Sequence, residues 1–175
     1  RLIYKKAYAT VTIVDQIKEL VESKYTLKNI RTIFNPVNLE EVDDRVNELI
    51  NINFDYIIAI GQYHDNIKQF DKLIVSYADS ILPEKDIHLV ILGNGNKDFL
   101  RKVAVDNNVG KFIHLLGFQD NPFKYLNRSR FLVLSSKNEG FANVLVESLA
   151  CQIPVVAFDC LCGPSTIIKD KENGL

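Results

Sequence analysis

Short runs of consecutive apolar residues recur along most of this chain, and between them lie segments whose apolar residues return every three or four positions. The first pattern is typical of strands buried on both faces, and the second is typical of helices. Because helical crossovers connect parallel strands, the alternation predicts an α/β fold: a Rossmann-like parallel sheet with helices on both faces. The expected strands are 56–60, 87–92, 112–116, 131–134 and 154–158, and the expected helices are 68–81, 97–107, 121–127 and 143–151.

Loops rich in glycine or polar residues follow four of these strands. Gly61, Gly93 and Gly117 each come at the end of a run, and the segment 135–141 follows the run at 131–134. In a parallel sheet these loops lie at the carboxyl edge, where ligands bind. We therefore expect the binding site there.

The first 34 residues follow a separate pattern. They predict short strands at 11–14 and 30–34 and a helix at 16–23. Asn35 and Pro36 then interrupt regular structure. This segment is expected to belong to a different structural unit from the repeated strands and helices.

Composition narrows the class of protein. With 175 residues, 47% apolar and 25% charged, and a net charge of −1, the chain resembles ordinary globular proteins and gives no electrostatic reason to expect nucleic-acid binding. No apolar run reaches the roughly 18 residues of a membrane span, and no signal peptide opens the chain. It begins with Arg and contains no Met, so we expect an excerpt of a longer protein.

The three cysteines, Cys151, Cys160 and Cys162, are odd in number, and the last two are too close to close an ordinary disulfide loop. A reducing, cytoplasmic environment fits them best. A metal site is the alternative, but neither the cysteines nor the three histidines show the spacing of metal ligands, and no Asp-x-Asp pair is present. We expect chemistry without metal or cofactor.

The helix expected from Asn143 is apolar on nearly every side, and Glu147 is the one charge inside it. No basic residue lies three or four positions away, so this carboxylate needs hydrogen-bond donors from elsewhere. Glu139 and Gly140 precede the helix, and glycine permits close approach to the backbone.

The N–H groups of Asn143, Val144 and Leu145 at the helix start favour a phosphate. A phosphate-binding helix start between Glu139 and Glu147, which can accept hydrogen bonds from hydroxyl groups, suits a nucleotide sugar. The alternative is that Gly140 is only a turn residue and Glu147 reaches solvent or a distant arginine.

The segment EGFANVLVESLACQIPVVAFDC resembles the signature of glycosyltransferase family 4, the retaining enzymes of the GT-B fold, in which seven residues separate two glutamates. The resemblance covers nearly the whole chain in the expected order. It includes Ile60-Gly61, Lys68-Gln69-Phe70, Leu92-Gly-Asn-Gly95, Gly163-Pro164-Ser165 and Glu172-Asn-Gly-Leu175.

The resemblance implies a role for each matching residue. Lys68 would meet the diphosphate of the donor, Glu139 the hydroxyls of the transferred sugar, and Glu147 the ribose. Lys68 and Glu139 are thus the candidate catalytic residues. The remaining candidates for substrate binding are Gly61, Gln62, Gly140, Phe141, Asn143, Val144 and Leu145.

Gln62 departs from the family pattern, which usually has Arg after this glycine. Gln donates hydrogen bonds but carries no charge, which puts the strength of catalysis or the alignment of this loop in doubt. A protonated His64 is a candidate replacement, with an ordinary loop histidine as the alternative.

The resemblance also implies domains: 1–34 as the tail of an acceptor domain, 35–38 as a hinge, and 39–175 as a truncated donor-binding domain. The full enzyme would transfer a sugar from a nucleoside diphosphate sugar, with a UDP-sugar expected first, to a cell-surface polysaccharide or a lipid-linked oligosaccharide. It would contact the membrane peripherally through the missing domain. The excerpt alone would bind but not transfer. The alternatives are a non-catalytic nucleotide-binding module, a UDP-sugar epimerase of GT-B fold and a purely structural domain.

Overall fold

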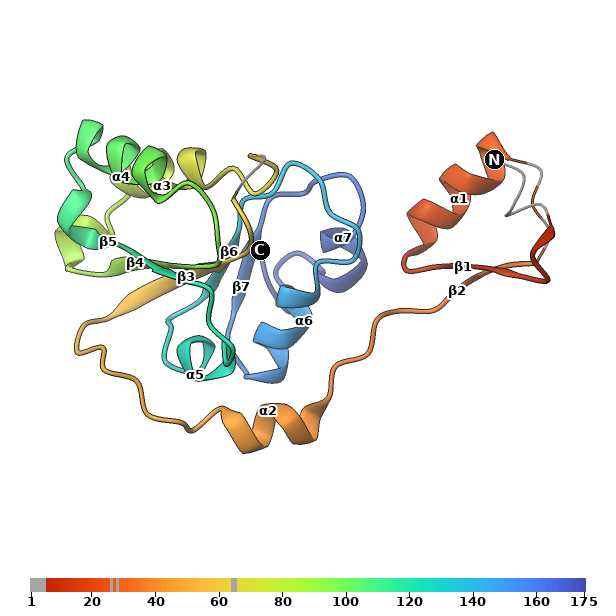
Figure 1. Ribbon diagram of the computed structural model, residues 1–175, viewed down its shortest axis with the longest axis horizontal. Coiled ribbons are helices and arrows are strands. Elements are labelled where there is room, and N and C mark those ends of the chain that lie inside the picture. The colour runs from red at the N-terminus through yellow and green to blue at the C-terminus, as the bar shows by residue number, and fades with distance from the viewer. Residues whose placement is uncertain (1–5, 26, 28, 64–65) are drawn as a thin grey trace.

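A five-stranded parallel sheet forms the centre of the larger part of the molecule (Figure 1). The computed structural model describes residues 6–25, 27, 29–63 and 66–175. The spatial strand order is β5-β4-β3-β6-β7. The strands are β3 (Tyr56–Ile60), β4 (His88–Leu92), β5 (Ile113–Gly117), β6 (Leu132–Leu134) and β7 (Val155–Ala157).

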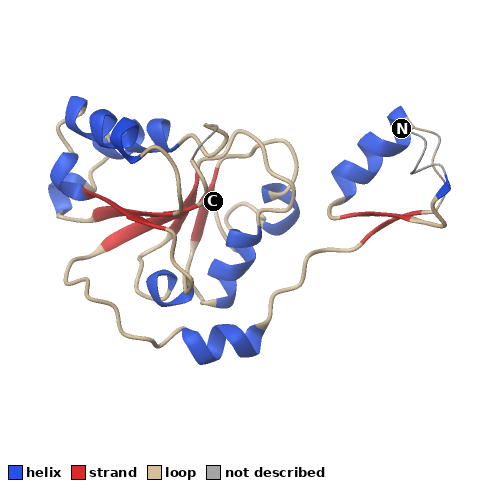
Figure 2. Cartoon of the chain, in the orientation of Figure 1, coloured by secondary structure: helices blue, strands red, loops and turns tan. Residues whose placement is uncertain are grey.

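The two faces of the sheet carry separate cores, because successive side chains of a strand point to opposite sides. On β3, Ile57 and Ala59 pack towards α3 (Phe70–Ala78) and α4 (Lys97–Asp106). Tyr56 and Ile58 pack on the other face. That face is covered by α2 (Leu39–Arg45), α5 (Phe123–Leu126) and α6 (Asn143–Ala150), as Figures 1 and 2 show. The predicted parallel sheet with helices on both faces is confirmed.

The N-terminal part forms a small unit of its own. Strands β1 (Thr10–Thr12) and β2 (Ile30–Thr32) pair in parallel, and α1 (Asp15–Lys24) connects them. All three predicted elements are present, although both strands are shorter than the patterns suggest. None of the helices in the described ranges is long and apolar enough to cross a membrane.

Two short α-helices of the described residues were not expected, α2 and α7 (Pro164–Ile167). Helix α2 begins where the Asn38 side chain accepts a hydrogen bond from the Glu41 N–H, and it buries only Val42. A helix held by one cap and one apolar contact leaves no periodic pattern in the sequence. Helix α3 also begins at Phe70 rather than at 68, because Gln69 adopts a left-handed conformation.

The glycine-containing loops meet at the carboxyl edge of the sheet, as predicted. The Gly61 N–H donates to the Leu92 carbonyl oxygen, and the Gly93 N–H donates to the Gly117 carbonyl oxygen. A Cβ atom at Gly93 would lie 1.9 Å from the Gly61 carbonyl oxygen. Glycine at position 93 is therefore required by the contact between two neighbouring loops.

Candidate functional site

The site lies at the switch point of the sheet. From β3 the chain builds outward through β4 to β5 at one edge, and it then returns to place β6 on the other side of β3. The chain therefore continues from β3 to α3 on one face of the sheet and from β6 to α6 on the other face. The carboxyl edge at such a switch point is where open α/β sheets bind ligands.

Lys68 and Glu139, the two candidate catalytic residues, meet at this edge of the sheet. The Lys68 ammonium donates to Glu139 Oε1 at 2.6 Å, across 71 positions of sequence. Both side chains are largely buried, with exposed fractions of 21% and 11%. The short distance and the burial make this a charge-assisted hydrogen bond, stronger than a surface ion pair.

The Lys68 side chain packs against the backbone of Gly61. A Cβ atom at position 61 would lie 2.7 Å from Lys68 Cε and 3.0 Å from its Cδ. The aliphatic part of the lysine thus lies directly over the glycine. Gly61 contributes to the site by leaving room for Lys68.

Two serines that were not among the predicted site residues form hydrogen bonds to Lys68 and Glu139. Ser136 donates to Glu139 Oε1 at 2.6 Å, and Ser135 donates to the Lys68 carbonyl oxygen at 2.6 Å. Both serines follow β6 directly and are almost fully buried. Two adjacent polar residues at the carboxyl end of an apolar run were the available signal in the sequence.

Helix α6 begins beside the pair, and its first amides are oriented by an unusual residue. Ala142 adopts a left-handed conformation at φ 60°, which costs a non-glycine residue about 1–2 kcal/mol. The Leu145 N–H donates back to the Ala142 carbonyl oxygen at 2.9 Å. Within the described residues, the N–H groups of Asn143 and Val144 have no acceptor. Of the three N–H groups predicted to favour a phosphate, those of Asn143 and Val144 are therefore free, and that of Leu145 is not.

Glu147 lies one turn further along α6 and is half buried. No hydrogen bond of the described residues reaches its carboxylate. Burial, and to a smaller extent the charge of Glu41, raises the pKa of Glu147. The local structure thus leaves an unpaired acceptor on the helix whose first amides are free, as the sequence pattern indicated.

Gly140 and Phe141 have packing roles that the sequence did not indicate. A Cβ atom at Gly140 would lie 3.1 Å from Ile13 Cδ1 of the N-terminal unit. The Phe141 side chain is buried with Val14 and Cys162 and stacks on Phe34, with ring centroids 5.8 Å apart. A ligand would therefore meet Phe141 through its backbone and not through its ring.

Gln62 is exposed next to Gly61, so its amide is accessible from solvent. His64, the candidate replacement for the missing arginine, lies outside the described residues. The substrate-binding role of Gln62 stays a prediction, as do the roles of the other candidate residues.

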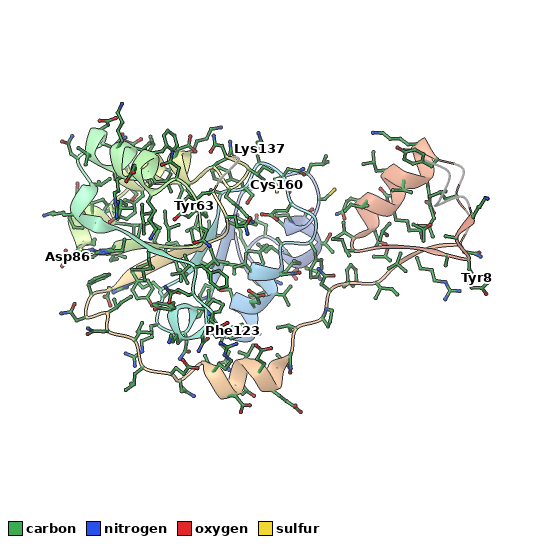
Figure 3. The ribbon with its side chains drawn as sticks, in the orientation of Figure 1. Tyr8, Tyr63, Asp86, Phe123, Lys137 and Cys160 are labelled. Carbon is green, nitrogen blue, oxygen red and sulfur yellow. The ribbon has the colours of Figure 1, made fainter. Side chains whose placement is uncertain are left out.

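The loop after β7 lies against the loop that carries Glu139. Asn138 pairs with Leu161, and a Cβ atom at Gly163 would lie 3.3 Å from Glu139 Cβ. Figure 3 labels Lys137 and Cys160 on these two neighbouring loops. Burial, and then the charge of Glu139, raises the pKa of the Cys160 thiol. Among the described residues, no three His, Cys, Asp or Glu side chains are grouped so that they could hold a metal ion.

The comparisons with known proteins agree with this architecture. The model of the family described as "Glycosyl transferases group 1" matches residues 55–175. The chain belongs to this glycosyltransferase family. Its fold is that of a GT-B glycosyltransferase domain.

Two curated relatives illustrate the similarity. One is N-acetylgalactosamine-N,N'-diacetylbacillosaminyl-diphospho-undecaprenol 4-alpha-N-acetylgalactosaminyltransferase of Campylobacter jejuni, which is 35% identical over 161 residues; these make up 91% of this chain and 43% of the relative. The other is poly(ribitol-phosphate) alpha-N-acetylglucosaminyltransferase of Staphylococcus aureus, which is 29% identical over 86% of this chain and 35% of the relative. The chain thus spans less than half the length of these relatives.

Solved structures give the same picture. A mutant of S. aureus TarM in complex with fondaparinux, alpha-GlcNAc-glycerol and UDP superimposes with a TM-score of 0.83 and 25% identity, over 98% of this chain and 34% of that one. The apo form of the lipopolysaccharide outer core galactosyltransferase WaaB superimposes with a TM-score of 0.76 and 22% identity, over 96% of this chain and 48% of that one.

Proposed function

We propose that this chain is the donor-binding part of a retaining glycosyltransferase of family 4. The whole protein would move a sugar from a nucleoside diphosphate sugar, most simply a UDP-sugar, to a polysaccharide or lipid-linked acceptor. The relatives named above act on such acceptors, and one solved neighbour holds UDP. We further propose that residues 1–34 belong to the acceptor domain, 35–38 to the hinge and 39–175 to the donor domain.

The observation that carries the proposal is the set of groups at the switch point. The Lys68–Glu139 pair, two free amides at the start of α6 and the unpaired Glu147 carboxylate lie on loops and a helix that converge there. Together they offer a cation and amides for phosphate, and carboxylates for hydroxyl groups. This is the chemistry of a nucleotide sugar.

In the proposed mechanism, negative charge grows on the diphosphate as the bond between sugar and phosphate breaks. Lys68 and the N–H groups of Asn143 and Val144 would stabilise that charge most strongly in the transition state, which lowers the barrier. Glu139 would orient the sugar hydroxyls, and the acceptor would attack from the leaving-group side. No metal or other cofactor enters this scheme.

Nucleotide titration tests the proposal. Heat of binding and amide chemical shifts would be measured with UDP, ADP and GDP. We expect UDP to bind, and Lys68→Ala to weaken binding about 10- to 100-fold, the range of a hydrogen bond to a charged group. Lys102→Ala, a change at an exposed lysine of α4, is the matched control and should leave affinity unchanged.

The outcomes separate the alternatives. A lack of response to all three nucleotides would favour a structural domain and contradict the proposal. The longer protein, supplied with donor and acceptor, should yield a glycoside whose anomeric configuration matches that of the donor. Binding without transfer would indicate a nucleotide-binding module, and an epimerised donor would indicate an epimerase. A cytoplasmic location with peripheral membrane contact remains a prediction for that longer protein.

A further inference from the structure

The two buried serines after β6 perform a task that the proposed mechanism does not yet include. Ser135 and Ser136 have exposed fractions of 1% and 0%. A buried hydroxyl is costly unless it is hydrogen-bonded, and both hydroxyls are bonded to members of the site. Their partners are therefore informative about what they hold in place.

Ser136 acts on one specific oxygen of Glu139. Its hydroxyl and the Lys68 ammonium both donate to Oε1, each at 2.6 Å. Within the described part of the chain, no donor reaches Glu139 Oε2. One carboxylate oxygen is thus held by the protein, and the other is left as an acceptor.

Ser135 acts on the backbone that carries the lysine. Its hydroxyl donates to the Lys68 carbonyl oxygen at 2.6 Å, and the Lys137 N–H donates to the Ile67 carbonyl oxygen at 3.0 Å. These two bonds join the loop after β6 to the loop after β3. These bonds hold the backbone of Lys68 and do not involve its ammonium.

We propose that Ser136 is a positioning residue that holds the Glu139 carboxylate for the transferred sugar once the donor has bound. This inference rests on the proposed function. A diphosphate carries more negative charge than one carboxylate, so it draws the Lys68 ammonium away from Glu139. Ser136 is then the donor that remains on Oε1, and it keeps Oε2 directed at the sugar hydroxyls.

The test compares ligands with and without the sugar. The affinities of the chain for UDP, UDP-GlcNAc and UDP-GalNAc would be measured by calorimetry for Ser136→Ala and Ser136→Thr. Ser129→Ala is the matched control, because Ser129 is, like Ser136, a buried serine with a hydrogen-bonded hydroxyl. Its hydroxyl donates to the Leu126 carbonyl oxygen, away from the site.

We expect Ser136→Ala to leave the affinity for UDP within about twofold and to weaken the better-bound UDP-sugar about tenfold. Ser136→Thr keeps a hydroxyl and should restore most of the loss. In Glu139→Gln, the further change Ser136→Ala should have little added effect on UDP-sugar affinity, because the two residues act as one unit. Ser129→Ala should change none of the ligand affinities.

Three results would overturn the inference alone: Ser136→Ala behaving as wild type with every ligand, equal weakening of UDP and UDP-sugar, or additive effects of the two changes in the double variant. Wild-type protein that binds no nucleotide would overturn the proposed function, and this inference with it. The two failures are therefore distinguishable in one data set.

Discussion

The Asn35 side-chain amide donates to the side-chain oxygen of Asn143 at 2.8 Å, across 108 positions of sequence. Asn143 is the first residue of α6, and its own N–H is one of the two free amides that are candidates for binding phosphate. The neighbouring Phe34 stacks on Phe141. The segment that joins the N-terminal unit to the sheet thus contacts the loop between the two acidic residues.

We expect Asn35→Ala to loosen the N-terminal unit. An exposed neutral hydrogen bond contributes about 0.5–1.5 kcal/mol, so amide hydrogen exchange at residues 10–17 should become roughly 2- to 10-fold faster. UDP affinity should change by less than about threefold, because the Asn143 N–H is untouched. The control is Asn127→Ala, which removes a long hydrogen bond to the Val46 carbonyl oxygen. Unchanged exchange at 10–17 would show that this contact holds nothing in place.

Glu147→Gln should stabilise the protein and weaken nucleotide binding. The folded-state pKa of Glu147 is raised, so the folded chain favours the protonated acid and loses stability as pH rises above about 4.5. The neutral amide removes that loss at pH 7. The thermal midpoint should rise, by about 2–4 °C for each kcal/mol gained.

Thermal melts and UDP titrations of the same preparation check both halves of this prediction. Glu22→Gln, at an exposed position of α1, should alter neither quantity. A lower midpoint for Glu147→Gln would mean that the ionised carboxylate is stabilised by a partner. Unchanged UDP affinity would remove Glu147 from the ribose role.

The histidine pair at the opposite edge of the sheet predicts a pH-dependent stability. His88 Nδ1 lies 2.8 Å from His114 Nε2, and the Phe54 ring stacks on both imidazoles. Burial, and then the charge of His88, lowers the pKa of His114. The unfolded chain therefore binds the proton more readily. Stability from this group is complete above about pH 6.5 and decreases as pH falls through that value.

Urea unfolding at pH 7.5, 6.5 and 5.5 would measure this loss. Protonation of one group changes the unfolding free energy by at most about 1.4 kcal/mol per pH unit. His114→Gln keeps a hydrogen-bonding side chain without titrating, so its stability should vary less with pH than that of the wild type. Equal pH slopes in the two proteins would exclude His114 as the source.

Gly93→Ala should destabilise the chain strongly. A methyl group at this position meets the Gly61 carbonyl oxygen at 1.9 Å, and the backbone φ of 132° disfavours any side chain. We expect a loss of about 2–4 kcal/mol, measured by chemical denaturation. In Gly110→Ala the added Cβ lies 3.3 Å from a Val105 methyl group, so the loss should be below about 1 kcal/mol. Similar stability of both variants would contradict the close approach of the two loops.

The sequence was sufficient for the sheet and its main helices. The apolar run 56–60 becomes β3 with the predicted limits, and the periodic segments at 97–107 and 143–151 become α4 and α6 within one residue at each end. The spacing of apolar residues within one segment indicates which of its side chains are buried, and this spacing can be read from that segment alone. The same patterns place Lys68 and Glu139 after the carboxyl ends of two parallel strands, in the segments that lead to the next helices. They do not say that β3 and β6 are neighbours.

Only the tertiary structure decided which groups touch. Because the chain returns from β5 to place β6 beside β3, the ammonium of Lys68 reaches Glu139 Oε1. The Ser136 hydroxyl donates to the same oxygen. Asn35 bonds to Asn143, and Ile13 lies on Gly140, because the linker folds back onto the start of α6. Hydrogen bonds between distant segments depend on strand order and loop path, and no periodicity along the chain encodes either one.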